Sequence, residues 1–91
     1  MFYAYILQSE RNSSFYIGSC ENIHQRLIQH NKGLGKSTKR FVPWVVVYFE
    51  KFETSKEARK REMQIKSWKK RGAIKNLIKH FKKFQQIVDP R

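Results

Sequence analysis

The 91-residue sequence has only one cysteine, seven acidic residues and no long apolar run. The lone Cys20 excludes an intrachain disulfide and a cysteine-based zinc site, which fits a reducing compartment, and we predict the cytoplasm. The apolar stretch at residues 2–8 is short and lacks a basic leading region, so we interpret it as a strand and not as a signal peptide. No segment approaches the roughly 18 apolar residues of a membrane span, and we expect no membrane partner.

Positive charge dominates what the sequence does contain. Its 20 Lys and Arg residues outnumber its 7 Asp and Glu residues, which gives a formal net charge of +13. An excess of this size repels itself and favours a polyanionic partner. DNA is the first candidate and RNA the second, while a basic surface that is merely solvated is the alternative.

The length and apolar content predict one compact domain. A hydrophobic fraction of 40%, with 7 Phe, 4 Tyr and 2 Trp, is enough for a single core in a chain of this size. We place this domain at residues 1–84 and assign residues 85–91 to a C-terminal tail, because the tail shows no clear pattern.

The strand and helix signals predict an α+β fold. Residues 2–8 and 15–18 form a β-hairpin, and residues 22–31 form a helix that Asn22 caps. Residues 42–49 are the strongest strand, with Pro43 at its start because proline cannot donate to the ladder. Together with two later helices, this predicts a small three-stranded antiparallel sheet flanked by helices, in the order β-β-α-β-α-α.

The two later helices have distinct signals. Thr54 and Glu57 form a capping box that opens a helix to about Lys70, and Gly72 supplies its stop. A last helix begins at Ala73 and carries an apolar side made of Ile74, Leu77, Ile78, Phe81 and Phe84. We expect this side to pack on the sheet. A dimer contact is the alternative, and the oligomeric state stays open.

Five polar side chains stand out from these elements. Tyr5 and Tyr16 share one face of the hairpin if its strands pair in an odd-sum register, for example with the two tyrosines opposite each other. Arg26 and His30 lie one turn apart on the same helix. Glu62 shares a helical face with the apolar residues at 58 and 65, where a buried carboxylate needs a partner.

These residues lie in segments that resemble the GIY-YIG nuclease family. Residues 3–7 and 15–19 resemble its paired signature strands, and residues 25–31 resemble the helix that follows them. Residues 43–50 and 57–62 resemble its third strand and its metal-carrying helix. The similarity covers roughly residues 2–70 and is greatest to short, single-domain bacterial members similar to the nuclease module of the excinuclease. The second signature is kept as Tyr-Ile-Gly, whereas Ala-Tyr-Ile keeps only the tyrosine of the first.

The resemblance implies a metal-dependent endonuclease that hydrolyses DNA. It implies that Glu62 holds one Mg²⁺ or Mn²⁺, a hard cation that prefers oxygen ligands. It also implies that one of Tyr5 and Tyr16 activates or positions the attacking water, although the sequence does not say which. Arg26 is the candidate for stabilising the charge of the transition state, and His30 could orient a tyrosine, transfer a proton or contact a phosphate.

Each of these roles has a structural alternative. Glu62 could form an ion pair with Arg59, Lys66 or Arg26 and hold no metal. The two tyrosines could serve core packing, Arg26 could be a solvated charge, and His30 could bond the last carbonyls of its helix. The glycine at position 18 could let a phosphate or metal approach the strand, or it could mark a bulge.

A basic, glycine-bearing loop follows the first helix and is interpreted as facing DNA. We predict that the nucleic-acid contacts come from this loop and from the later helix, at Lys36, Thr38, Lys39, Arg40 and Lys66. No base-reading element is recognisable, so little sequence specificity is expected. Selective cutting of branched or flapped DNA, in repair or recombination, rests on analogy, and a partner protein could be needed for targeting. The alternative is a catalytically weak nucleic-acid-binding module of the same fold.

Overall fold

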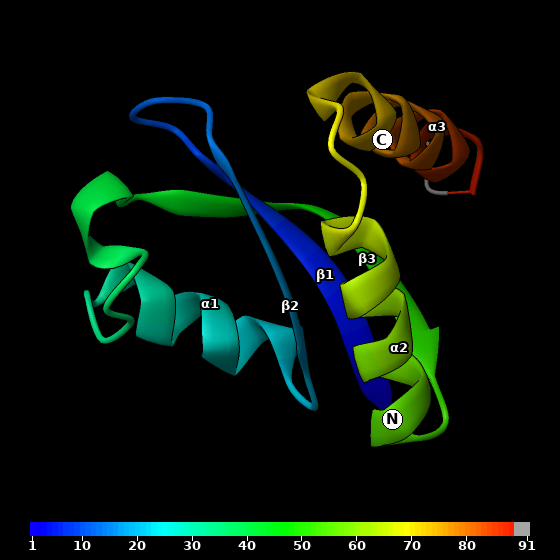
Figure 1. Ribbon diagram of the computed structural model, residues 1–91, viewed down its shortest axis with the longest axis horizontal. Helices are drawn as coiled ribbons and strands as arrows, with labels where there is room; N and C mark the ends of the chain where they lie inside the picture. The colour runs from blue at the N-terminus through cyan, green and yellow to red at the C-terminus, as the bar shows by residue number, and fades with distance from the viewer. Residues whose placement is uncertain (89–91) are drawn as a thin grey trace.

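The computed structural model describes residues 1–88, and the surroundings of side chains for residues 1–81. It has three strands, three α-helices and one short 3-10 turn (Figure 1). In chain order these are β1 (Phe2–Ser9), β2 (Phe15–Cys20), α1 (Ile23–Asn31), the turn Lys39–Phe41, β3 (Trp44–Phe52), α2 (Ser55–Lys66) and α3 (Arg71–Val88). The predicted α+β fold and its order β-β-α-β-α-α are confirmed.

The strands form one antiparallel sheet in the order β2-β1-β3, so β2 and β3 are its edges. Tyr5 pairs with Gly18, and Leu7 pairs with Tyr16. This register has the odd sum that places both tyrosines on one face, although the two are diagonal neighbours and not directly opposite. The pairing of β1 with β3 shifts between Ile6 and Leu7, which marks a β-bulge.

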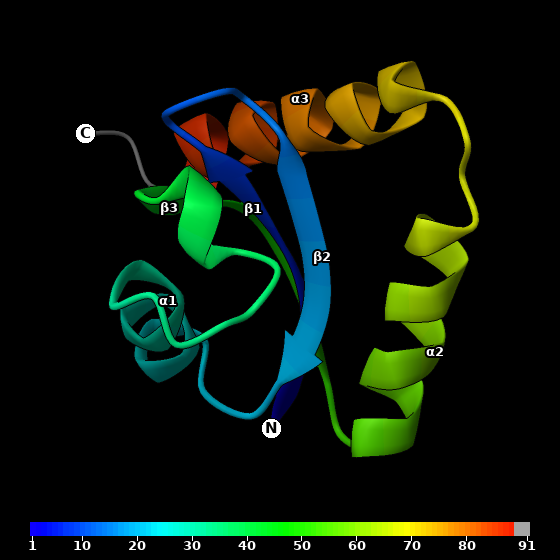
Figure 2. The same ribbon diagram turned by 60° about the vertical axis from the view of Figure 1, so that its left-hand side comes forward.

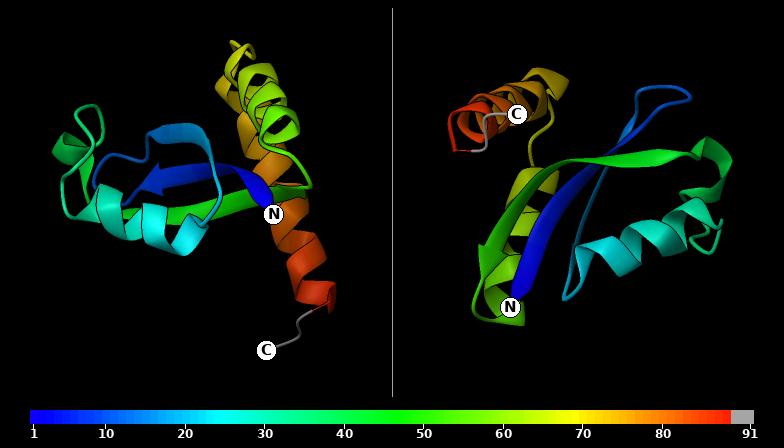
Figure 3. Two further views of the ribbon diagram at one scale, coloured as in Figure 1. Left: turned by 90° about the horizontal axis from the view of Figure 1, so that it is seen from below. Right: turned by 180° about the vertical axis from the view of Figure 1, so that it is seen from behind.

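Helices cover both faces of the sheet, and the two faces have separate cores. On one face Tyr5, Leu7 and Trp44 are buried against α1 and the segment after it. On the other face Ile6 and Ile65 belong to a core that includes residues of both α2 and α3. Figure 2 shows α1 and α2 on opposite sides of the sheet, and the view from below separates α1 from the α2–α3 side (Figure 3, left).

The caps predicted for α1 and α2 are present. The side chain of Asn22 accepts from the backbone N–H of Gln25 at 3.0 Å. The hydroxyl of Thr54 accepts from the backbone N–H of Glu57 at 3.2 Å and donates to its carboxylate at 3.0 Å. Both helices therefore begin where the sequence predicts, because the orphan N–H groups of the first turn find partners.

The end predicted for α2 is wrong. The helix ends at Lys66 and not near Lys70, and Gly72 lies inside the first turn of α3 and is not a stop. Ser67 is the C-cap, and its hydroxyl donates to the carbonyl of Gln64 at 2.6 Å. Beyond this cap, Trp68 packs against the same core as Ile65.

The helix α3 lies across one end of the α2 face, and its buried Ile74 and Ile78 join the core there. The ring of Phe81 packs edge-on against Tyr48 and Phe49 of β3, with ring centroids 5.2 Å apart in each case. The predicted packing of the last helix on the sheet thus holds for Phe81, while the side chain of Phe84 lies outside the described residues. The helix itself continues through Val88, into the segment predicted as a tail. Within residues 1–88, no helix is long and apolar enough to cross a bilayer.

Candidate active site

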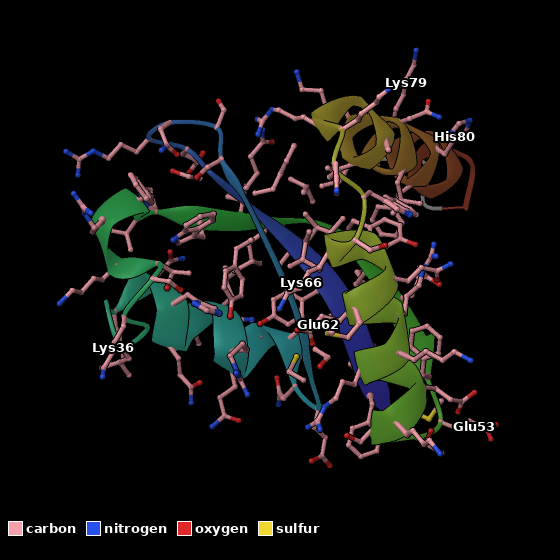
Figure 4. All side chains as sticks on the ribbon, in the orientation of Figure 1. Lys36, Glu53, Glu62, Lys66, Lys79 and His80 are labelled. Carbon is pink, nitrogen blue, oxygen red and sulfur yellow. The ribbon has the colours of Figure 1, made fainter. Side chains whose placement is uncertain are left out.

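The candidate site surrounds the edge strand β2, which lies between α1 and α2 (Figure 1). The tyrosine pair, Arg26 and His30 are on the α1 face, and Glu62 reaches the strand from the α2 face. Figure 4 shows Glu62 on the side of α2 that faces β2. Because β2 is an edge strand, groups from the two faces can act on a single ligand that lies along it.

Tyr5 is the most enclosed member of this group. Its side chain is 1% exposed, and its ring centroid lies 6.4 Å from that of Tyr16. Burial raises the pKa of the Tyr5 phenol well above its usual range, and the neighbouring Tyr16 raises it further. Among the charged groups around this phenol, Arg26 lowers the pKa and Glu62 raises it. Tyr5 therefore keeps its proton at neutral pH.

Gly18 leaves the space that the Tyr5 phenol occupies. A Cβ atom on Gly18 would lie 2.6 Å from the Tyr5 hydroxyl oxygen and 3.2 Å from the ring of Tyr16. Any side chain at position 18 would thus push one of the tyrosines out of place. The glycine of the second signature has a packing reason in this chain, in addition to the predicted backbone approach of a ligand.

His30 lies at the centre of the α1 side of the site. Its Nε2 atom is 3.4 Å from the Tyr5 hydroxyl oxygen, and its Nδ1 atom is 2.8 Å from the Thr38 hydroxyl oxygen. The ring also packs against Tyr16, at a centroid separation of 4.8 Å. Burial lowers the pKa of His30, and the positive charge of Arg26 lowers it further. His30 is therefore a neutral imidazole at pH 7, in contact with both tyrosines.

Arg26 is the exposed member of the α1 side. In the part of the chain whose side chains the structure describes, its guanidinium makes no hydrogen bond or ion pair. A small hollow of about 140 Å³ opens beside it, lined also by His30, Gln29, Leu34 and Gly35. A planar guanidinium at the rim of such a hollow can bind two phosphate oxygens at once.

Glu62 is held by two hydrogen bonds, one to each carboxylate oxygen. The hydroxyl of Ser19 donates to Oε1 and the ammonium of Lys66 donates to Oε2, both at 2.6 Å. Burial disfavours the ionised form, but Lys66 and Ser19 outweigh it and leave the pKa of Glu62 below its usual value. The carboxylate is therefore ionised at neutral pH. Lys66 is one of the ion-pair partners named as alternatives to a metal.

The donor set fits one hard cation that keeps several waters. Among the described residues, no three His, Cys, Asp or Glu side chains come together in a way that could hold a metal. A lone ionised carboxylate suits Mg²⁺ or Mn²⁺, which often bind one or two carboxylates plus substrate phosphates. The metal would need to displace Lys66, whose side chain is 47% exposed and can move into solvent. Glu62 would thus be its protein ligand.

The predicted nucleic-acid contacts fall into two groups. Lys36, Lys39 and Arg40 are exposed around the loop and the turn that follow α1, so they stay candidates for phosphate contacts. Thr38 is 1% exposed and its hydroxyl is engaged with His30, so it is a buried residue of the site and not a surface contact. Lys66 is paired with Glu62.

The sequence does not indicate that Ser19 belongs to the site, or that Thr38 contacts His30. Ser19 lies 43 positions before its partner Glu62, and Thr38 lies 8 positions after His30. Only Thr38 and His30 are close enough in the chain for a local sequence pattern to indicate their contact, and the glycine at position 35 is that pattern. A Cβ atom there would lie 2.5 Å from the Thr38 hydroxyl oxygen, so this glycine makes room for the threonine.

Comparisons with known proteins agree on the relatives of this chain. The family described as GIY-YIG catalytic domain matches residues 1–83. The UPF0213 protein SSP2268 of Staphylococcus saprophyticus is 40% identical over 74 residues, which are 80% of this chain and 89% of that protein. The UPF0213 protein CPE1444 of Clostridium perfringens is 43% identical over 67 residues, covering 72% and 71% of the two chains. The solution NMR structure of the UPF0213 protein BH0048 from Bacillus halodurans is similar in fold, with a TM-score of 0.55, 28% identity, and coverage of 87% of this chain and 84% of that one.

Proposed function

The chain belongs to the GIY-YIG family, and from that premise we propose that it is a metal-dependent endonuclease that hydrolyses DNA phosphodiester bonds with little sequence specificity. The family match supports nuclease-type chemistry. The observation that carries the proposal is the convergence of Tyr16, Arg26 and Glu62 on the edge strand β2 from both sides of the sheet. A net charge of +13 favours a polyanionic substrate.

Hydrolysis needs a water oxygen to attack phosphorus, a P–O bond to break, and a proton to leave the attacking water. Of the two phenols, half-buried Tyr16 is better suited to this proton transfer, because Tyr5 is enclosed and bonded to His30. A phenol needs help from a cation to act as a base, and Arg26 on the same face of the sheet is the candidate. Arg26 would also bind the phosphate oxygens as they gain negative charge.

Glu62 would hold the divalent metal, with Ser19 fixing the direction of one of its carboxylate oxygens. When bound, Mg²⁺ or Mn²⁺ supplies positive charge against the phosphate and the leaving oxygen. The ammonium of Lys66, once displaced, would stay close enough to contact a phosphate. Lys36, Lys39 and Arg40 would hold the DNA backbone on the other side of β2.

The biological setting of this activity is proposed on resemblance. We infer action in the cytoplasm on branched, flapped or otherwise exposed DNA, in repair or recombination, with a partner protein for targeting. RNA is the second substrate candidate, since the basic surface does not distinguish the two backbones.

One observation favours a second candidate function. The ion pair between Lys66 and Glu62 occupies the carboxylate that is proposed to bind the metal. A chain in which that pair persists would bind nucleic acid and cut it poorly. This binding module of the same fold is the alternative that the experiment must separate from the nuclease.

A nicking assay on supercoiled plasmid, with Mg²⁺ or Mn²⁺, tests the proposal. Glu62→Gln removes the metal-binding charge and Arg26→Ala removes the phosphate-binding cation, and each should lower the nicking rate by about a hundredfold or more. Glu53→Gln and Lys60→Ala are the matched controls, because they remove the same charges at exposed positions that take no part in the hydrogen bonds of the site. They should cut at the wild-type rate.

Two results would overturn the nuclease. Equal nicking by the wild type and by both site variants would mean that a contaminating enzyme cuts the plasmid. No nicking by the wild type with any metal, pH or branched substrate, together with retained DNA binding, would favour the binding module.

A further inference from the structure

A buried chain of contacts leads from the loop after α1 to the tyrosine pair. The Thr38 hydroxyl oxygen lies 2.8 Å from Nδ1 of His30, and Nε2 of His30 lies 3.4 Å from the Tyr5 hydroxyl oxygen. Thr38 and Tyr5 are each 1% exposed and His30 is 6% exposed. Water therefore has little access to these atoms, and each one depends on the others for its hydrogen bond.

Thr38 is fixed in place independently of His30. The indole N–H of Trp44 donates to the Thr38 carbonyl at 2.9 Å, and the backbone N–H of Phe41 donates to the same oxygen at 3.2 Å. The backbone N–H of Thr38 donates to the carbonyl of Gly35 at 3.3 Å. The backbone that carries the hydroxyl is thus held by three hydrogen bonds, so the hydroxyl can determine how the imidazole ring is oriented.

The two ends of the imidazole compete for a single proton. A neutral imidazole carries one N–H, so either Tyr5 donates to Nε2 while Nδ1–H donates to Thr38, or Thr38 donates to Nδ1 while Nε2–H donates to Tyr5. A phenol is more acidic than an aliphatic hydroxyl and is the stronger donor. The first arrangement is therefore favoured.

We propose that Thr38 is a positioning residue that accepts a hydrogen bond from Nδ1–H of His30 and so leaves Nε2 free to accept the Tyr5 hydroxyl. Its effect on cleavage rests on the function proposed above, but its effect on His30 does not. The loop that carries Lys36 and Lys39 then has a second task, since it also fixes the hydrogen-bonding state of the site.

The tautomer can be measured directly by long-range ¹H–¹⁵N NMR of the protein labelled at histidine nitrogen. At pH 8 the wild type should show His30 with Nδ1 protonated and Nε2 unprotonated. Thr38→Ser keeps the hydroxyl and should give the same pattern. A wild-type protein with Nε2 of His30 protonated would overturn the proposal. This test uses the wild type alone, so it does not depend on whether a variant folds.

The titration of His30 gives an independent test whose sign depends on the direction of the bond. If Thr38 accepts from Nδ1–H, it stabilises the imidazolium, and Thr38→Val should lower the pKa of His30 by about half a unit. If Thr38 donates instead, the same variant should raise it. Arg26 from α1, Tyr5 from β1 and Tyr16 from β2 also face the ring and are unchanged, so the comparison isolates the hydroxyl.

Nicking by the same variants connects the inference to function. Thr38→Val should cut plasmid about tenfold more slowly than the wild type, as is typical when a group that orients a catalytic residue is lost. Thr38→Ser should recover most of the rate. The positioning role would be contradicted if Thr38→Val cut at the wild-type rate and kept the wild-type tautomer of His30. A protein that cuts no substrate would contradict the proposed nuclease and leave the NMR results to decide the role of Thr38.

Discussion

Ser19 is a small side chain with a large expected effect, because it orients the carboxylate at the centre of the candidate site. Its hydroxyl donates to Oε1 of Glu62 at 2.6 Å across the edge of the sheet. We predict that Ser19→Ala lowers the nicking rate by about tenfold, within the range found when a partner of a metal ligand is removed. The rate should be measured over a series of Mn²⁺ concentrations, since the loss should shrink as the metal approaches saturation.

Ser37→Ala is the matched control for this substitution. Ser37 is exposed in the loop after α1 and lies outside the hydrogen bonds of the site. Equal rates for the two alanine variants at low Mn²⁺ would contradict the role given to Ser19.

The buried imidazole of His30 gives folding a pH dependence of known sign. Burial and the charge of Arg26 lower its pKa in the folded protein below the value of about 6.5 that it has in an unfolded chain. Between these two values the unfolded chain binds a proton that the folded protein does not. The free energy of unfolding should therefore be highest above pH 6.5 and fall as the pH drops below it. Urea unfolding at pH 7.5, 6.5 and 5.5 measures this dependence.

Two variants assign this loss to one histidine. His30→Gln should flatten the dependence between pH 7.5 and 5.5, whereas His24→Gln, at an exposed position of the same helix, should leave it as in the wild type. The carboxylate of Glu62 does not interfere, because its lowered pKa keeps it ionised throughout this range. A wild-type slope that survives in His30→Gln would show that other groups cause it.

At this scale the sequence predicts residue types and faces but not their partners. Periodicity places Tyr5 and Tyr16 on one face if the register has an odd sum, and it places Arg26 and His30 on one side of their helix. The structure supplies the register and the packing of α1 on that same face. The burial of Thr38 could not be predicted in the same way. A threonine in a lysine-rich loop looks exposed, and only the tertiary contact with His30 makes it part of the site.

The helix α3 is joined to the β1–β2 turn by one arginine at its first residue. The guanidinium of Arg71 lies 4.2 Å from the ring centroid of Phe15 and also donates to the carbonyl of Ser13. We predict that Arg71→Ala destabilises the protein by about 1 kcal/mol, from the lost cation–π contact and the lost hydrogen bond. Thermal unfolding should show this as a lower melting temperature.

Lys70→Ala is the control for the loss of a nearby positive charge. Lys70 is exposed, directly precedes α3 and makes no side-chain contact of this kind within the described residues. A melting temperature equally lowered by both variants would mean that charge, and not the contact with Phe15, determines the effect.

Helix starts and helix ends differ in how well the sequence predicts them. The starts of α1 and α2 are local events in which Asn22 and Thr54 satisfy nearby N–H groups, so a short motif is sufficient. The end of α2 has no such local motif: the helix stops at Lys66, and Trp68 just beyond it packs against core residues from other elements. Gly72, the local signal that the sequence offers, lies instead in the first turn of α3.

At the scale of the whole molecule, net charge predicts a partner class but not a binding face. The described lysines are spread over several elements: Figure 4 shows Lys36 beside α1, Lys66 at α2 and Lys79 on α3. The fold adds the missing information, because the candidate site is confined to the edge strand β2 between α1 and α2.

Salt dependence of DNA binding tests whether the basic residues near β2 hold the backbone. If about six phosphates are neutralised, the logarithm of the binding constant should fall with the logarithm of salt concentration with a slope of roughly −5. The double variant Lys36→Gln, Lys39→Gln should reduce that slope by about 2, since each lost phosphate contact removes about 0.9. The double variant Lys75→Gln, Lys79→Gln removes the same charge from exposed positions on α3 and should change the slope much less. Fluorescence anisotropy with a short labelled duplex, measured from 50 to 200 mM salt, gives all three slopes. Equal reductions by the two double variants would mean that overall charge, and not the edge of the sheet at β2, determines where DNA binds.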